Sequence, residues 1–154
     1  MRRGRRLGVD AGAARIGVAS CDPDGLLATP VETVPARDTP AALRRLSQLV
    51  AEYEPIEVVV GLPRSLNGTE GRAAATARAL AQRIARRVAP VPVRLVDERM
   101  STVTAARDMR MSGVSAKRGR SRIDQAAAVV ILQSALEAER LSGRPPGECV
   151  EVVV

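Results

Sequence analysis

The segment LGVDAGAARIGVASC, residues 7–21, holds two short apolar runs on either side of a turn built from small residues. Leu7 to Ala11 is predicted to be a strand that ends at Gly12, and Ile16 to Cys21 is predicted to be a second strand. A third strand is predicted over residues 26–34, where Pro30 interrupts the run. Three strands in succession indicate an antiparallel meander at the start of the fold.

Helices and strands alternate after this meander. Thr39 is a suitable N-cap and Pro40 fits the first helical position, so a helix is predicted there that Pro55 ends. The later predicted elements are a strand around residues 58–60, a helix over about 70–88, a strand at 93–96, a short helix at 101–111, a basic connection at 114–122 and a long helix at 123–141. This order predicts an α/β fold with one mixed five-stranded sheet, three antiparallel strands followed by parallel strands, flanked by helices.

The chain is predicted to form a single domain over residues 1–143. Residues 144–154 form a C-terminal tail with strand-like composition, a candidate for an added edge strand. No secretory signal is recognised, and the longest apolar run is too short to cross a bilayer. Two lone cysteines fit a reducing compartment. We therefore expect a cytoplasmic protein without membrane contact.

Charge and composition narrow the chemistry. The net charge is +7, the sequence pI is about 11.0, and Lys117 is the only lysine among the 24 basic residues. Arginine matches phosphate oxygens well, so a polyanionic partner is favoured, although a compositional bias toward arginine and alanine would give the same count. Histidine is absent. Histidine-based nuclease chemistry and Cys–His nucleophiles are therefore excluded, and any phosphodiester hydrolysis must use carboxylates and a hard metal ion.

Four acidic residues lie at predicted element ends. Asp10 closes the first strand, and Asp97 and Glu98 close the last core strand. Strand alternation sends Asp97 and Glu98 to opposite faces, and Glu98 is preferred as the site residue, with Asp97 the second choice. Asp124 shares a helix stripe with apolar residues, but Ser121 and Asp124 also fit a capping box. Taken one at a time, these acids are explained by turn formation or helix capping. Taken together, they are explained by a metal site that holds Mg²⁺ or Mn²⁺, with two ions, and whose ligands are Asp10, Glu98 and Asp124.

The sequence resembles the YqgF/RuvX family along nearly its whole length. The resemblance rests on four ordered blocks: Leu7–Gly12 continuing through Arg15–Ala19, Val59–Pro63 followed by Asn67–Gly71, Asp97–Thr102, and Asp124–Ala128 followed by Ile131–Ser134. It implies an RNase H-like fold related to Holliday-junction resolvases. The residues around Arg64 to Leu66 are less typical of the family, and the Val150–Val154 tail lies outside its usual core.

The resemblance also implies a function. Family members are described as nucleases that mature the 5′ end of the small-subunit ribosomal RNA precursor, and some as junction resolvases. Metal-ligand and catalytic roles follow for Asp10, Glu98 and Asp124. The expected partner is nucleic acid, either structured RNA or branched DNA, and the chain is expected to act as a monomer or a homodimer.

Candidate phosphate contacts are basic residues near the predicted acids. They are Arg15, Arg64, Lys117, Arg118, Arg120 and Arg122, the last four of which directly precede Asp124. A solvated basic surface is the simpler explanation for such a run. With almost no aromatic side chains for base stacking, recognition is expected to follow backbone and shape.

Two further functions are compatible with the sequence. A non-catalytic RNA-binding module would use the arginines and leave the carboxylates as caps and turn formers. The glycine-rich segment after Leu7 also resembles the phosphate loop of sugar kinases and actin-like ATPases. That fold needs two large lobes and a second acidic loop, which this chain lacks.

Overall fold

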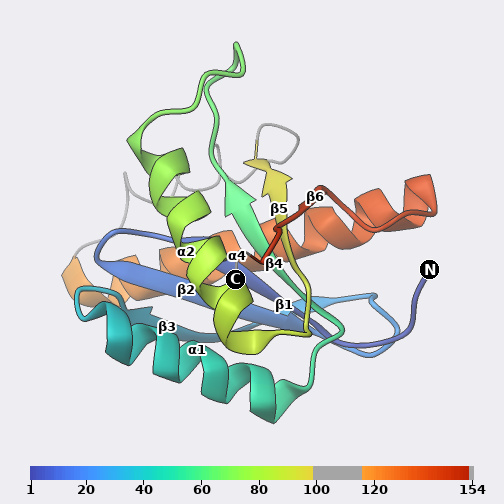
Figure 1. Cartoon of the computed structure of the whole chain (residues 1–154), viewed down its shortest axis with the longest axis horizontal. Coiled ribbons are helices and arrows are strands. Elements are labelled where there is room, and N and C mark those ends of the chain that lie inside the picture. Colours follow the sequence, from blue (N-terminus) through green and yellow to red (C-terminus); the bar gives the residue numbers. More distant parts are fainter. Residues whose placement is uncertain (99–115, 153–154) are drawn as a thin grey trace.

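The structure is a computed structural model that describes residues 1–98 and 116–152, with residues 116–123 described by their backbone alone. Its elements are β1 (Arg6–Ala11), β2 (Arg15–Cys21), β3 (Ala28–Pro35), α1 (Thr39–Tyr53), β4 (Glu57–Leu62), α2 (Arg72–Val88), β5 (Val93–Asp97), α4 (Ala116–Ser142) and β6 (Glu148–Cys149). They are arranged as one sheet with helices on both faces (Figure 1). The short helix predicted over residues 101–111 lies outside the described residues.

The sheet is mixed and six-stranded, in the order β3-β2-β1-β4-β5-β6. β1, β2 and β3 form the predicted antiparallel meander, whereas β4 and β5 run parallel to β1. The sixth strand comes from the C-terminal tail, where Glu148 and Cys149 pair antiparallel with β5. The predicted mixed α/β sheet is therefore present, with one more strand than the five expected.

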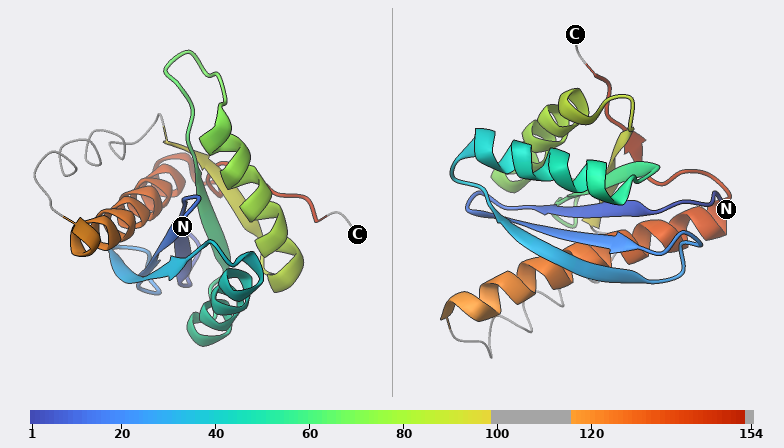
Figure 2. Two further views of the ribbon diagram at one scale, coloured as in Figure 1. Left: turned by 90° about the vertical axis from the view of Figure 1, so that its left-hand side faces the viewer. Right: turned by 90° about the horizontal axis from the view of Figure 1, so that it is seen from below.

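Two layers of helices cover this sheet. Figure 2 shows α1 and α2 on one face and α4 on the other. The α1/α2 face carries the larger apolar cluster, in which Leu46 and Leu49 of α1 pack with Val58, Val60 and other strand residues. On the α4 face the helix contributes a stripe of small and branched residues: Ala128, Ile131, Leu132 and Ala135. No helix in the described part of the chain is both long and apolar enough to cross a membrane.

Helix ends account for two corrections to the sequence predictions. Asp38, not Thr39, caps α1, because its carboxylate accepts a hydrogen bond from the Ala41 backbone N–H at 3.1 Å. α4 begins at Ala116, not at residue 123. The predicted basic connection over residues 114–122 is thus wrong from Ala116 onward, because lysine, arginine and alanine are good helix formers and carry the helix back beyond its apolar half.

Ion pairs with buried carboxylates connect the N-terminal segment to the sheet and to α4. Arg6 Nη2 lies 2.8 Å from Glu139 Oε2 of α4, and both side chains are almost fully buried. Arg2 bonds both Glu139 and Glu57, and Arg94 Nε lies 3.0 Å from Glu57 Oε2. Burial raises the pKa of Glu139, but the hydrogen bonds and charge of Arg2 outweigh burial and leave this pKa lowered. The cluster joins the N-terminus, the C-terminal half of α4 and the sheet.

Candidate functional site

Asp10 projects from the carboxyl end of β1 onto the α4 face. Leu7 and Val9 belong to the cluster under α1 and α2, so alternation along the strand turns Gly8 and Asp10 to the opposite face. Gly8 confirms this orientation, because a Cβ built there would lie 2.7 Å from Leu132 Cβ of α4. The Asp10 side chain is only 8% exposed, so its carboxylate lies at a nearly buried position.

Glu98 reaches the same face from the residue that follows β5. Its Oε1 would lie 2.6 Å from a Cβ at Gly61, so the carboxylate occupies space that any other residue at position 61 would fill. Gly61 follows Val60, and Val60 pairs with Val9 of β1. This register sets Asp10 beside Gly61 on the neighbouring strand, and Glu98 is only 6% exposed.

Asp97 points away from this position. Leu95 lies in the cluster under α1 and α2, and alternation places Asp97 on that same side of the sheet. Its Oδ2 lies 3.3 Å from Arg64 Nη1. The structure thus places Glu98, the preferred residue of the pair, on the α4 face with Asp10, and Asp97 on the opposite side.

Asp124 faces the sheet from α4. A Cβ at Gly17 of β2 would lie 2.1 Å from the Asp124 backbone oxygen, so helix and strand touch backbone to backbone. Gly17 is the Cα partner of Asp10, which brings Asp124 to the carboxyl end of β1. The capping-box alternative is wrong, because Ser121 and Asp124 lie inside α4 and not at its first turn.

The Asp124 carboxylate bonds an arginine. Arg15 Nε of β2 donates to Asp124 Oδ2 at 2.9 Å, and the Asp124 side chain is 18% exposed. Within the described part of the chain, no three Asp, Glu, Cys or His side chains are grouped closely enough to hold a metal ion. The three predicted acids thus share one region, but as they stand they do not form a closed three-carboxylate cage.

A hard divalent cation nevertheless fits part of this region. Magnesium and manganese prefer carboxylate oxygens and retain several waters, so a site of one or two carboxylates is sufficient. Asp10 and Glu98 supply two nearly buried carboxylates on either side of a residue without a Cβ. Asp124 is a third carboxylate on this face, and it is bonded to Arg15.

Two of the predicted phosphate contacts are already bonded to acids. Arg15 binds Asp124, and Arg64 lies within ion-pair distance of Glu70 and Asp97. Hydrogen bonds from Arg78, aided by the charges of Arg78 and Arg64, lower the pKa of Glu70 to about 2. The other four, Lys117, Arg118, Arg120 and Arg122, lie on the first turns of α4, and their side chains are outside the described residues.

Sequence reasoning missed the glycines that shape this region. Gly8, Gly17 and Gly61 each stand where α4 or Glu98 leaves no room for a Cβ. Their signal was present in the sequence, since an isolated glycine inside a predicted strand often marks close approach of another backbone. All three belong to strands β1, β2 and β4, which pair side by side.

Solved structures share this architecture. RuvC of T. thermophilus, in a complex with a Holliday junction substrate, matches with a TM-score of 0.59 over 93% of this chain and 99% of that chain, at 17% identity. A second T. thermophilus RuvC structure matches with a TM-score of 0.58 at 16% identity. The likeness confirms the predicted RNase H-like fold.

Proteins with similar sequences align with the whole chain. Proteins of Streptomyces coelicolor and Streptomyces avermitilis are 76% and 74% identical over 154 residues, which is all of this chain and 92% and 99% of those proteins. A protein of Thermobifida fusca is 60% identical over 98% of both chains. Each carries the name "Putative pre-16S rRNA nuclease".

A family pattern described as "RuvX: Holliday junction resolvase" matches residues 4–138. That span runs from just before β1 into the last turns of α4 and includes Asp10, Glu98 and Asp124. With the match extending over most of the sequence and with relatives alike from end to end, this chain belongs to the RuvX family.

Proposed function

We propose that this chain is a divalent-metal-dependent endonuclease that hydrolyses phosphodiester bonds of structured RNA, with 5′-end maturation of pre-16S ribosomal RNA as its reaction. The name of its relatives supports the substrate. The observation that carries the chemistry is that two nearly buried carboxylates lie on the α4 face: Glu98 Oε1 close to Gly61, and Asp10 on the neighbouring strand, one residue after the partner of Val60.

Each residue then has a defined task. Asp10 and Glu98 hold Mg²⁺ or Mn²⁺, which when bound activates water and stabilises charge on the phosphodiester. Asp124 is the third carboxylate, and Arg15 is its present partner. If Asp124 turns toward the cation, the Arg15 guanidinium is freed to bind a phosphate oxygen of the substrate. Histidine is absent from the sequence, so no imidazole serves as nucleophile or general base here.

The test is cleavage of a precursor RNA fragment that spans the mature 5′ end. Wild type is compared with Asp10→Asn, with added Mg²⁺, added Mn²⁺ or a chelator. Asp38→Asn is the matched control: it also removes one carboxylate, and asparagine is an equally good N-cap for α1. We expect the chelator and Asp10→Asn to abolish cleavage and Asp38→Asn to preserve it.

Two results would contradict the proposal. Cleavage that survives Asp10→Asn would remove the assigned chemistry. Metal-independent RNA binding with no cleavage under any condition would favour a non-catalytic RNA-binding module.

Resolution of Holliday junctions is the second candidate. The fold match to RuvC and the description of the family favour it. A four-way junction has two-fold symmetry, so paired cuts require a homodimer. Junction DNA is therefore tested beside precursor RNA at equal protein concentration. Symmetric junction cuts by a dimer, with intact precursor RNA, would select this function.

A further inference from the structure

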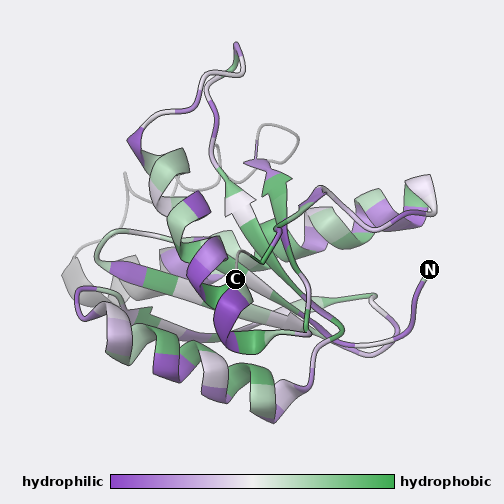
Figure 3. Cartoon of the chain, viewed as in Figure 1, coloured by the Kyte–Doolittle hydropathy of each residue, from purple (hydrophilic) through white to green (hydrophobic). Residues whose placement is uncertain are grey.

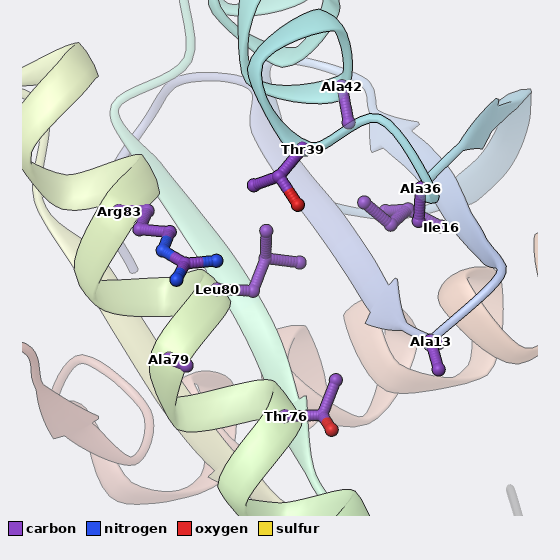
Figure 4. A pocket seen from close by; sticks show the side chains of 10 residues that line it. Ala13, Ile16, Ala36, Thr39, Ala42, Thr76, Ala79, Leu80 and Arg83 are labelled. Carbon is purple, nitrogen blue, oxygen red and sulfur yellow. The ribbon is translucent and has the colours of Figure 1, made fainter.

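A cavity lies on the other side of the sheet, between the start of α1 and the middle of α2. Figure 4 shows its walls: Ala13 and Ile16 of the β1–β2 hairpin, Thr39 and Ala42 of α1, and Ala79, Leu80 and Arg83 of α2. Its volume is about 220 Å³. Cavities that enclose a whole cofactor or drug-sized ligand measure roughly 300–1,000 Å³, so this one suits a smaller group entering from the surface.

Arg83 is the one charged side chain in the cavity wall. Its guanidinium extends from α2 across the cavity toward Thr39 (Figure 4), and within the described part of the chain it has no hydrogen bond or ion pair. The acid nearest in sequence to the α1 wall is Asp38, and its carboxylate is occupied as the helix cap. A planar guanidinium beside apolar walls matches a phosphate group attached to an apolar ring.

Unpaired arginines gather on this helical layer. Paired arginines occur both on this layer and elsewhere: Arg45 of α1 bonds Glu32 of β3, and Arg6 of β1 bonds Glu139 of α4. Six exposed arginines without an acidic partner among the described residues lie on α1, on α2 or just before α1, and three others, Arg5, Arg140 and Arg144, lie elsewhere; the six are Arg37, Arg44, Arg72, Arg83, Arg86 and Arg87. Figure 3 shows hydrophilic bands along the outer side of α2. Such a surface attracts a polyanion.

The cavity and the carboxylate region share one structural element. Gly12 and Ala13, at the tip of the β1–β2 hairpin, line the cavity. Asp10 lies two residues earlier and faces the opposite side of the sheet. A strand of nucleic acid that passes Asp10 and continues over this hairpin tip therefore reaches the cavity between α1 and α2.

We infer that this cavity is a second binding site for single-stranded RNA: one base enters between Ala79 and Ala42, and Arg83 binds the adjacent phosphate. The surrounding arginines on α1 and α2 bind further phosphates of the same strand. The inference rests on the proposed function in that RNA is taken as the substrate. Binding here does not require cleavage, and the site lies outside the carboxylate region.

The experiment measures binding of fluorescein-labelled oligouridylates by anisotropy, in the Asp10→Asn background so that no RNA is cut. One oligonucleotide has about 20 nucleotides and one about 4, which is near the smallest site size of single-strand-binding folds. Arg83→Ala removes the phosphate contact. Ala79→Leu fills the cavity from an exposed position of α2 with a residue that favours helix, so folding is retained.

The matched control is Arg144→Ala. Arg144 is exposed, lies after α4 and is outside the arginine-rich layer. We expect Arg83→Ala and Ala79→Leu each to weaken binding of the long oligonucleotide about tenfold and Arg144→Ala to weaken it less than about twofold. The short oligonucleotide should lose less affinity in both variants, because it can remain at the carboxylate region.

Equal losses of affinity in Arg83→Ala and Arg144→Ala would show that binding depends only on nonspecific charge, and would overturn the inference. So would wild-type affinity in both Arg83→Ala and Ala79→Leu. Failure of the proposed function is separable. If wild type never cuts precursor RNA but Arg83→Ala binds it weakly, only the nuclease is refuted. If cutting requires Asp10 but Arg83→Ala binds normally, only this second site is refuted.

Discussion

The two faces of the sheet are packed in different ways. Under α1 and α2, large side chains such as Leu46, Leu49 and Val60 interdigitate between helix and strand. Under α4, glycines at positions 8, 17 and 61 bring the helix against the strand backbone. Side chains can adjust to a change, whereas touching backbones cannot. We therefore expect the α1/α2 face to contribute most of the apolar stability and the α4 face to fix the spacing between helix and strands.

The largest expected loss of stability comes from the α1/α2 face. Leu49 is 1% exposed in the centre of that cluster, so Leu49→Ala should lower the free energy of unfolding by about 2–5 kcal/mol. Cleavage per folded molecule should change little, because no carboxylate of the candidate site moves. Urea unfolding and cleavage at low temperature measure the two effects. A folded Leu49→Ala protein with abolished cleavage would contradict this separation of the faces.

A smaller loss of stability but a larger loss of activity is expected at Gly17. A Cβ there would lie 2.1 Å from the Asp124 backbone oxygen, so α4 must shift. Gly17→Ala should cost about 1–3 kcal/mol of unfolding free energy and reduce cleavage even at full folding. Gly71→Ala is the control, since a Cβ at Gly71 meets no atom within 4 Å. Normal cleavage by folded Gly17→Ala would mean that the position of α4 is not critical.

The smallest effect is a pH dependence away from both faces. The pKa of Glu70 is lowered from an ordinary value of 4.5 to about 2, chiefly by its hydrogen bonds with Arg78. A lowered folded-state pKa gives stability that is present above pH 4.5 and is lost as the pH falls toward 2. Thermal melts of wild type and Glu70→Gln should therefore differ near neutral pH and converge toward pH 2. A difference in melting temperature between wild type and Glu70→Gln that stayed constant from neutral pH to pH 2 would contradict the assignment.

The sequence predicted the sheet because its strands carry local signals. The apolar runs of β1, β2 and β4 and the stripe of α1 are continuous patterns that the structure confirms. The start of α4 was predicted too late, because its first turns are basic and carry no apolar period. Strand alternation predicted that Asp97 and Glu98 point to opposite faces, and the structure places Asp97 on the α1/α2 side and Glu98 on the α4 side.

The rest of the candidate site depends on long-range contacts. The Arg15–Asp124 ion pair joins residues that lie on β2 and α4, and no local pattern pairs them. The contact of Gly17 with the Asp124 backbone likewise exists only once α4 is packed. The cavity of Arg83 needs the hairpin tip, α1 and α2 together. These features arise from packing, which one-dimensional periodicity does not encode.

Isothermal titration calorimetry with Mn²⁺ tests most directly whether the α4 face holds the cation. Glu98→Gln and Asp97→Asn neutralise neighbouring carboxylates that the structure places on opposite faces. We predict that Asp97→Asn binds Mn²⁺ like wild type and that Glu98→Gln loses at least about tenfold in affinity, since lost ligands cost no less than lost supporting groups. Weakened binding in Asp97→Asn together with unchanged binding in Glu98→Gln would contradict the account.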